Sequence, residues 1–239
     1  MSKEVTTQNT GTEVAQPAQS WAMPSGMNSS DIVIPKIACA QAMSKSVIDG
    51  DARFGDFMDS MTMEKLGDLK NPVNFIPFFM KKLWIVSKKD GGDWKFLKTE
   101  EVTLMNGGRS YFEVEDGVEY KNELVYNFYV LREGDFTLPY IISFKGSSKK
   151  AGLLLATQMY TKNARLGKCP AANVFALSGK KEDGEKGTYI VLSVSVVRDS
   201  TEEEMNEAFE WNKTLSSTTV KEHEESPELR EDAANQTAF

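Results

Sequence analysis

The sequence predicts a mainly β protein, and three observations support this fold class. From Val73 onward, β-branched and aromatic residues alternate with polar ones in short segments. Clusters such as Asp90-Gly91-Gly92 separate these segments, as turns separate antiparallel strands. Apolar residues take clear helical spacing after Ser148 and after Ser200, and the stretches before Val73 are only weakly helical. We therefore expect a sheet with few helices.

Three regions follow from the composition along the chain. Residues 1–30 are rich in Ser, Thr, Gln, Gly and Pro, with Trp21 as the only large aromatic residue, and are expected to form a disordered arm. Residues 31–214 form the folded domain, which opens with weakly helical stretches around 40–48 and 54–63. Residues 215–239 lose the core-forming residues and are expected to be a flexible acidic tail.

The strands of the folded domain come in two groups around a helix. We expect strands at residues 73–88, 94–104, 109–115, 122–132 and 138–145, and again at 171–180 and 188–197. Between the groups, Ala151, Leu154, Leu155 and Met159 form one stripe of a helix with Ser147 or Ser148 as N-cap. A second helix at residues 201–211 is expected to begin with the capping box Ser200-x-x-Glu203.

This succession is the order of an OB-like barrel. In that fold a helix joins the third and fourth of five strands, and the barrel is partly open. Here the additional strands would elaborate the barrel. Another antiparallel β or α+β domain has the same succession, and the alternative stays open at this point.

The composition argues against several classes of function. The lone histidine, His223, lies in an acidic stretch, and Cys39 and Cys169 are 130 positions apart, so neither an imidazole-based active site nor a thiolate zinc site is expected. No apolar run is long enough to span a membrane and the N-terminus has no signal-peptide pattern. We therefore expect a cytoplasmic protein that binds no metal or cofactor. We also expect that it is not an enzyme, because its acidic residues cluster in the predicted turns and in the tail.

The charges are strongly polarised along the chain. Residues 201–239 include 11 acidic and 3 basic residues, whereas residues 1–200 include 24 acidic and 25 basic residues. No Asp or Glu occurs between Thr137 and Lys181, where eight cations occur: Lys145, Lys149, Lys150, Lys162, Arg165, Lys168, Lys180 and Lys181. Such a stretch is typical of a polyanion-binding surface. An ordinary solvated lysine surface is the alternative.

Aromatic residues complete a possible site for single strands, because bases stack on exposed rings beside a basic groove. Among the rings in or beside the expected strands and helix, Trp84, Trp94 and Tyr189 are the best candidates. The segment FKGSSKKAG at residues 144–152 adds hydroxyls and lysines at a helix start, which suits a phosphate oxygen. It lacks the spacing of a P-loop. A plain helix cap is an equally good interpretation.

A basic, OB-like body followed by an acidic tail with an aromatic end resembles the bacteriophage and bacterial single-stranded DNA-binding proteins. The matching tail residues are Glu222, Glu224, Glu225, Glu228, Glu231, Asp232 and Phe239. The resemblance implies a tail that competes with DNA and recruits replication or recombination proteins. Residues 233–238 separate the last acid from Phe239, whereas the family places its acids close to the end.

We therefore expect sequence-independent binding and protection of single-stranded DNA during phage DNA replication or recombination. Lysines would contact the phosphates and two to four rings would contact the bases. A protein-binding module, such as a phage-encoded inhibitor or assembly factor, is the alternative from another class. An RNA-binding OB domain is a further alternative function. Separately, the sequence is compatible with a homo-oligomer.

Overall fold

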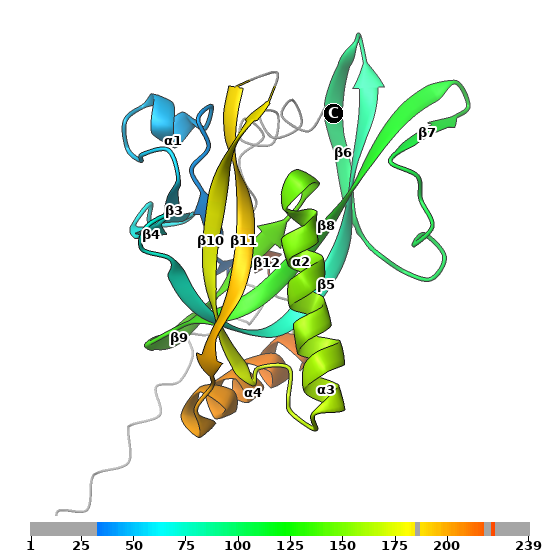
Figure 1. Ribbon diagram of the computed structural model, residues 1–239. Coiled ribbons are helices and arrows are strands. Elements are labelled where there is room, and N and C mark those ends of the chain that lie inside the picture. Colours follow the sequence, from blue (N-terminus) through cyan, green and yellow to red (C-terminus); the bar gives the residue numbers. More distant parts are fainter. Residues whose placement is uncertain (1–32, 185–186, 218–220, 223–239) are drawn as a thin grey trace, which may run out of the picture.

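The protein is mainly β in the computed structural model, which describes residues 33–184, 187–217 and 221–222 (Figure 1). These residues form a seven-stranded and a three-stranded antiparallel sheet and a parallel pair of β1 (Val33–Ile34) with β12 (Lys221–Glu222). The predicted N-terminal arm and the tail acids from Glu224 to Asp232 lie outside the described residues, as does Phe239. No helix in the described ranges is long and apolar enough to cross a membrane.

The strands predicted from Val73 onward are confirmed. They are β5 (Val73–Asp90), β6 (Asp93–Glu101), β7 (Phe112–Glu115), β8 (Val118–Arg132), β9 (Asp135–Phe144), β10 (Asn173–Gly184) and β11 (Gly187–Asp199). The predicted helix lies between β9 and β10. It consists of η2 (Gly146–Ser148), α2 (Lys149–Thr157), a π-helical turn η3 (Gln158–Lys162) and α3 (Asn163–Arg165).

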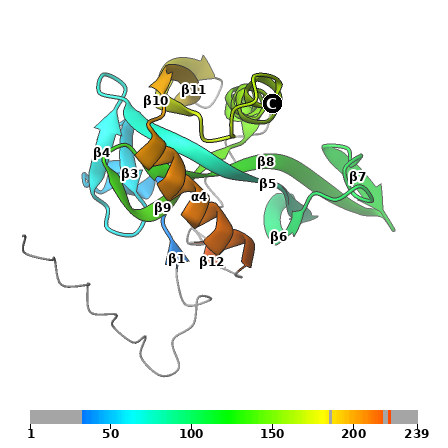
Figure 2. The same cartoon turned by 90° about the horizontal axis from the view of Figure 1, so that it is seen from below.

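The large sheet has two parts because β5 and β8 are long. The first residues of β5 pair with β10, its last residues pair with β6, and β8 lies along its other edge. β8 in turn pairs with β7 near its start and with β9 near its end. We call the strands β11, β10, β9 and the adjoining halves of β5 and β8 the body, and the other halves with β6 and β7 the arm. Figure 2 shows the arm extending to one side of the body.

Both faces of the body are covered. On one face, Ala151, Leu155 and Met159 of α2 and η3 pack on Tyr126, Phe128 and Phe144 of the sheet. On the other face, Ala208 and Trp211 of α4 (Glu202–Ser217) pack on Ile76, Phe78 and Tyr129. We call these the α2 face and the α4 face. Because side chains alternate along a strand, both faces can be followed from the body into the arm.

The small sheet corrects the prediction for residues 54–63, which were expected to be weakly helical. It contains β2 (Ile37–Cys39), β3 (Asp56–Asp59) and β4 (Lys65–Asp68), and only α1 (Lys45–Ile48) is helical nearby. All four residues of β3 are buried, and Phe57 joins the core under α2. The buried carboxylate of Asp56 is satisfied by Lys65 Nζ at 2.8 Å and by the Arg53 N–H at 2.9 Å. Tertiary pairing therefore outweighs the weak helical pattern.

The succession of strands and helix agrees with the OB-like prediction, but the sheet does not close by a ladder. Within the described residues no pairing joins β9 to β11. Two N–H groups on the outer edge of β11 bind side chains instead. The Ile190 N–H donates to Gln41 Oε1 at 2.8 Å, and the Leu192 N–H donates to Ser148 Oγ at 2.9 Å. Ser148 is the N-cap residue of α2, yet its side chain makes no cap hydrogen bond in α2. Closure into an OB barrel stays a prediction.

The capping box of α4 lies one residue later than predicted. The Thr201 N–H donates to Glu204 Oε2 at 2.8 Å, and the Glu204 N–H donates to Thr201 Oγ1 at 3.2 Å. The reason is that the Ser200 N–H still bonds to the Ala172 carbonyl at 3.0 Å, so the helix begins after it. Arg198 Nη2 also binds Glu204 Oε1 at 2.7 Å, and this ion pair lowers the pKa of Glu204.

Candidate nucleic-acid interface

Five of the eight basic residues that were predicted to bind DNA lie on the segment that follows β9. Lys149 and Lys150 are exposed at the start of α2, and Lys145 is half-buried just before η2. Lys162 at the end of η3 and Arg165 at the end of α3 are also exposed. At 1.5 Å per residue, residues 149–165 cover about 24 Å. No ion pair is found for any of the five among the described residues, and we call them the basic face. Asp199 lies close enough to Lys162 for this lysine to contribute to the lowered pKa of Asp199, so the charge of Lys162 is partly compensated.

The other three basic residues, Lys168, Lys180 and Lys181, lie outside the basic face. Lys168 Nζ lies 2.7 Å from Asp199 Oδ2, and this ion pair lowers the pKa of Asp199. Lys181 Nζ lies 4.9 Å from the ring centroid of Phe54, in a cation–π contact. Lys180 is exposed, but its side chain is on the α4 face because Lys181 pairs with the buried Ile190 on the other side. These three residues do not extend the basic face.

Trp84 is a core residue, which corrects its selection as a stacking platform. Its side chain is 6 % exposed, and its Nε1–H donates to the Asn106 carbonyl at 3.0 Å. The loop that connects β6 to β7 thereby covers the α2 face at the base of the arm. No base can reach this ring in the structure.

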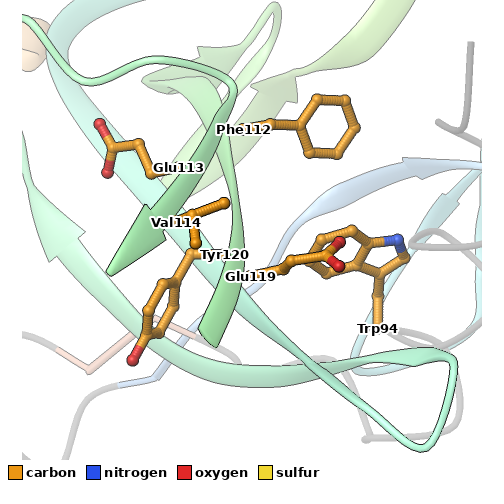
Figure 3. Close-up of a pocket in the computed structure, with 6 residues that line it drawn as sticks. All are labelled: Trp94, Phe112, Glu113, Val114, Glu119 and Tyr120. Atoms are coloured by element: carbon orange, nitrogen blue, oxygen red, sulfur yellow. The ribbon is translucent and has the colours of Figure 1, made fainter. Parts of the chain in front are cut away.

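Trp94 lies on the arm, on the face opposite to Trp84. It pairs with Lys89 of β5, so the two side chains lie on the same face of the sheet. Lys89 and Trp84 are an odd number of residues apart on β5, and such side chains point to opposite faces. Its ring is half-buried, with the Phe112 centroid at 5.7 Å and Lys89 Nζ at 5.9 Å. Figure 3 shows that Trp94 and Phe112 project to the same side of a shallow hollow of about 310 Å³. The other lining residues are Glu113, Val114, Glu119 and Tyr120.

Tyr189 also lies on the α4 face. It is adjacent to Ile190, which is buried, and its hydroxyl donates to Glu182 Oε2 at 3.3 Å. Burial and, to a smaller extent, the carboxylate of Glu182 raise the pKa of Tyr189. The structure therefore separates the two remaining predicted rings from the basic face instead of bringing them together with it.

Two residues that were not selected from the sequence do lie near the basic face. Tyr160 belongs to η3, between the two pairs of cations, and is 42 % exposed. Lys82 projects from the α2 face, with Nζ 5.5 Å from the ring centroid of Tyr126. Tyr160 could have been chosen from its position between Lys150 and Lys162. The place of Lys82 depends on the long-range pairing of β5 with β8, which has no local signal.

A group of side chains suited to metal ions is not found in the described ranges, where no three His, Cys, Asp or Glu residues are placed to hold one. The candidate interface itself contains cations, hydroxyls and one ring. Such groups contact phosphates and bases in nucleic-acid-binding proteins.

Comparison with known proteins gives one result. A family model described as Pam3 phage gp34-like protein matches residues 10–224, which is most of the chain. No curated protein and no solved structure matches it.

Proposed function

We propose that this chain, which belongs to the Pam3 phage gp34-like family, binds and protects single-stranded DNA during phage DNA replication or recombination. In this proposal the five cations of the basic face contact phosphates, without selecting a sequence. The exposed ring of Tyr160 offers one stacking surface between them. Trp94 and Tyr189 are not part of this surface.

The observation that carries the proposal is a cationic segment whose five basic residues form no ion pair among the described residues. A surface lysine usually has acidic neighbours, as Lys95 has in Asp90 at 2.8 Å. Along α2 and α3, by contrast, the sequence contains no acid between Thr137 and Lys181, and no ion pair from another described element reaches the basic face. Positive charge over about 24 Å, in which Asp199 partly compensates Lys162, attracts a polyanion more strongly than an evenly mixed surface does.

The acidic tail supports the same proposal. Residues 201–239 carry a net charge of −8, from 11 acids and 3 bases. A polyanionic segment of the same chain competes with DNA for the basic face, and this competition is expected to weaken binding at low salt. The resemblance to single-stranded DNA-binding proteins adds a second role to the proposal. In this role the tail recruits replication or recombination proteins, with Phe239 as the contact residue.

The experiment is a titration of a labelled dT oligomer of about 30 nucleotides with the full-length chain, followed by fluorescence anisotropy. Five neutralised phosphates predict a log–log salt slope of about −3.5, so affinity falls about 100-fold between 50 and 200 mM salt. A slope near zero would contradict the proposal. Unlabelled duplex and RNA competitors test whether single-stranded DNA is preferred.

Charge reversal locates the surface. The double variant Lys149→Glu/Lys150→Glu is expected to lose two phosphate contacts and to flatten the slope by about 1.4, for dT and dA oligomers alike. The matched control is Lys70→Glu/Lys88→Glu, which makes the same charge change at exposed lysines outside the helical segment. Equal losses in both variants would show that net charge alone matters. Neutralising the tail acids to Gln and Asn in the full chain should tighten binding.

A protein-assembly module is the second candidate, and the arm favours it. Its strands β6 and β7 expose Phe96, Leu97, Phe112 and Val114 to solvent. Apolar groups gathered on an exposed sheet are typical of protein contacts. Absence of binding to any nucleic acid, by a folded chain, would favour this candidate over the first.

A further inference from the structure

Charged side chains are buried on the α4 face of the arm. Tyr129 of β8 packs with α4, and Val125, Glu123 and Lys121 lie on the same face because each is an even number of residues before it. Lys121 is 3 % exposed and Glu123 is 8 % exposed. A buried ammonium or carboxylate group costs free energy unless neighbouring groups compensate for it. This face of the arm therefore resembles an interior and not a solvated surface.

The contacts of α4 do not account for this burial. Among the described residues, the cluster that α4 forms with the sheet includes Tyr129 and Leu131 of β8 and no earlier residue of that strand. Glu123 is six residues before Tyr129, about 20 Å along the strand. The ring of Tyr111 lies 5.7 Å from Lys121 Nζ and covers part of this side chain. Neither contact explains the burial of Glu123.

Three side chains on this face indicate the chemistry of a segment that would cover it. Val125 is 3 % exposed, yet it belongs to none of the hydrophobic clusters of the described residues. Glu123 Oε1 is buried and has no hydrogen-bond partner among these residues. The half-buried Lys81 lies on the same face, with Nζ 5.5 Å from the ring centroid of Tyr129. A covering segment therefore needs an apolar side chain, a hydrogen-bond donor and acidic groups.

Residues 223–239, which we call the terminal segment, have this composition. They contain Leu229 and Phe239, five acidic residues, one arginine, and amide and hydroxyl side chains. The fold also directs them to the arm. β12 is parallel to β1, and the chain just after β1 is parallel to β9. Because β9 is antiparallel to β8, it runs from the body toward the arm, and so β12 points toward the arm at Glu222.

The terminal segment is long enough to reach this face. Its 17 residues can span about 56 Å when extended, whereas the 15 residues of β8 cover about 50 Å. Residues 1–32 are the other long segment outside the described ranges. They join β1 at the end that points away from the arm, because β1 runs in the same direction as β9. The direction of the chain therefore favours the terminal segment.

We propose that the terminal segment docks on the α4 face of the arm, over Val125 and Glu123, with its acidic residues near Lys81. An apolar side chain, Leu229 or Phe239, then covers Val125, and a donor group of the segment binds Glu123 Oε1. Acids held there are kept from the basic face, which lies on the α2 side of the sheet. Docking therefore opposes the competition of the tail with DNA, a consequence that rests on the proposed function.

The test is zero-length cross-linking of the dilute full-length chain with a carbodiimide, which joins an amine to a carboxylate in contact with it. Mass spectrometry of the monomer then identifies the linked residues. The proposal expects cross-links from Lys81 or Lys121 to acids of residues 224–232. Cross-links of the terminal segment only to lysines of the basic face overturn the proposal. Cross-links from Lys81 and Lys121 only to acids of residues 1–32 overturn it as well.

Two controls are built into the chain. Lys89 Nζ and Glu119 Oε2 lie 2.8 Å apart, so their cross-link shows that the reagent has acted. Lys81→Arg keeps the positive charge but removes the reactive amine, so cross-links to position 81 should disappear while the one between Lys89 and Glu119 stays. If the Lys89–Glu119 cross-link forms and the terminal segment is linked to no residue of the arm, the proposal is also wrong.

Acylation of lysine amines gives an independent readout. In the full-length chain the buried Lys121 should react slowly and the exposed Lys88 quickly. Leu229→Glu/Phe239→Glu should release the terminal segment and raise the rate at Lys121 several-fold. The matched control, Leu104→Glu/Phe209→Glu, makes the same changes at exposed apolar residues of the fold and should leave Lys121 protected. Unchanged protection of Lys121 in the first variant overturns the proposal. Both readouts are made without DNA, so they stand apart from the test of the proposed function.

Discussion

Gly152 lies where α2 crosses the sheet, and replacing it with alanine tests how closely this helix is seated. A Cβ atom at this position would lie 2.8 Å from Phe144 Cβ and 3.2 Å from Tyr126 Cβ. Carbon atoms in good contact are about 3.5 to 4.0 Å apart. Both neighbours are attached directly to strand backbone, so no rotamer change can move them. The helix that carries Lys149 and Lys150 must lift from the sheet instead.

The expected magnitude comes from two opposed effects. In an open helix interior, Gly→Ala stabilises a protein by about 1 kcal/mol. Overpacking a core costs about 1 to 3 kcal/mol, and two contacts with backbone-fixed atoms place this site near the middle of that range. Gly152→Ala should therefore destabilise the fold by about 1 kcal/mol. For a chain of this size, Tm should fall by about 2 to 4 °C.

Thermal unfolding followed by circular dichroism measures this difference. Gly108→Ala is the matched control, because a Cβ there has no heavy atom within 4 Å. Its Tm should be unchanged or raised, since alanine reduces the conformational freedom of the unfolded chain. If Gly152→Ala unfolds at the same temperature as the parent or above it, the close seating of α2 on Phe144 and Tyr126 is refuted.

Two further predictions concern titratable groups. The ion pair with Arg198 lowers the pKa of Glu204, so its contribution to stability is complete above the unfolded value of about 4.3 and is lost as pH falls through the lower folded value. Glu204→Gln should lower Tm at pH 7, and the difference from the parent should shrink at pH 3; a constant difference would contradict this. Burial and, to a lesser extent, Asp56 raise the pKa of Cys39 to about 12, whereas Cys169 is exposed. DTNB at pH 8 should therefore modify one thiol of the folded chain quickly and the other only after unfolding, and Cys169→Ser should remove the fast reaction.

The strands from β5 onward could be predicted because their signal is local. Alternating apolar residues and turn clusters are encoded within each segment, and the switch to helical spacing after Ser148 is equally local. The small sheet could not be predicted in this way. β3 contains Asp56 and Asp59, which lower strand propensity, and its pairing with β2 and β4 depends on residues up to 22 positions away. The capping box moved by one residue for a similar reason, a backbone bond from Ser200 to Ala172.

The candidate site was predictable in its charges but not in its rings. Absence of acids between Thr137 and Lys181 is a property of the sequence, and five of its eight cations do share one segment without ion-pair partners in the described part of the chain. Which face a ring occupies depends on the register and on what covers it. Trp84 and Trp94 lie on opposite faces of one ribbon, and the loop through Asn106 covers Trp84. Neither relation is visible in the local pattern.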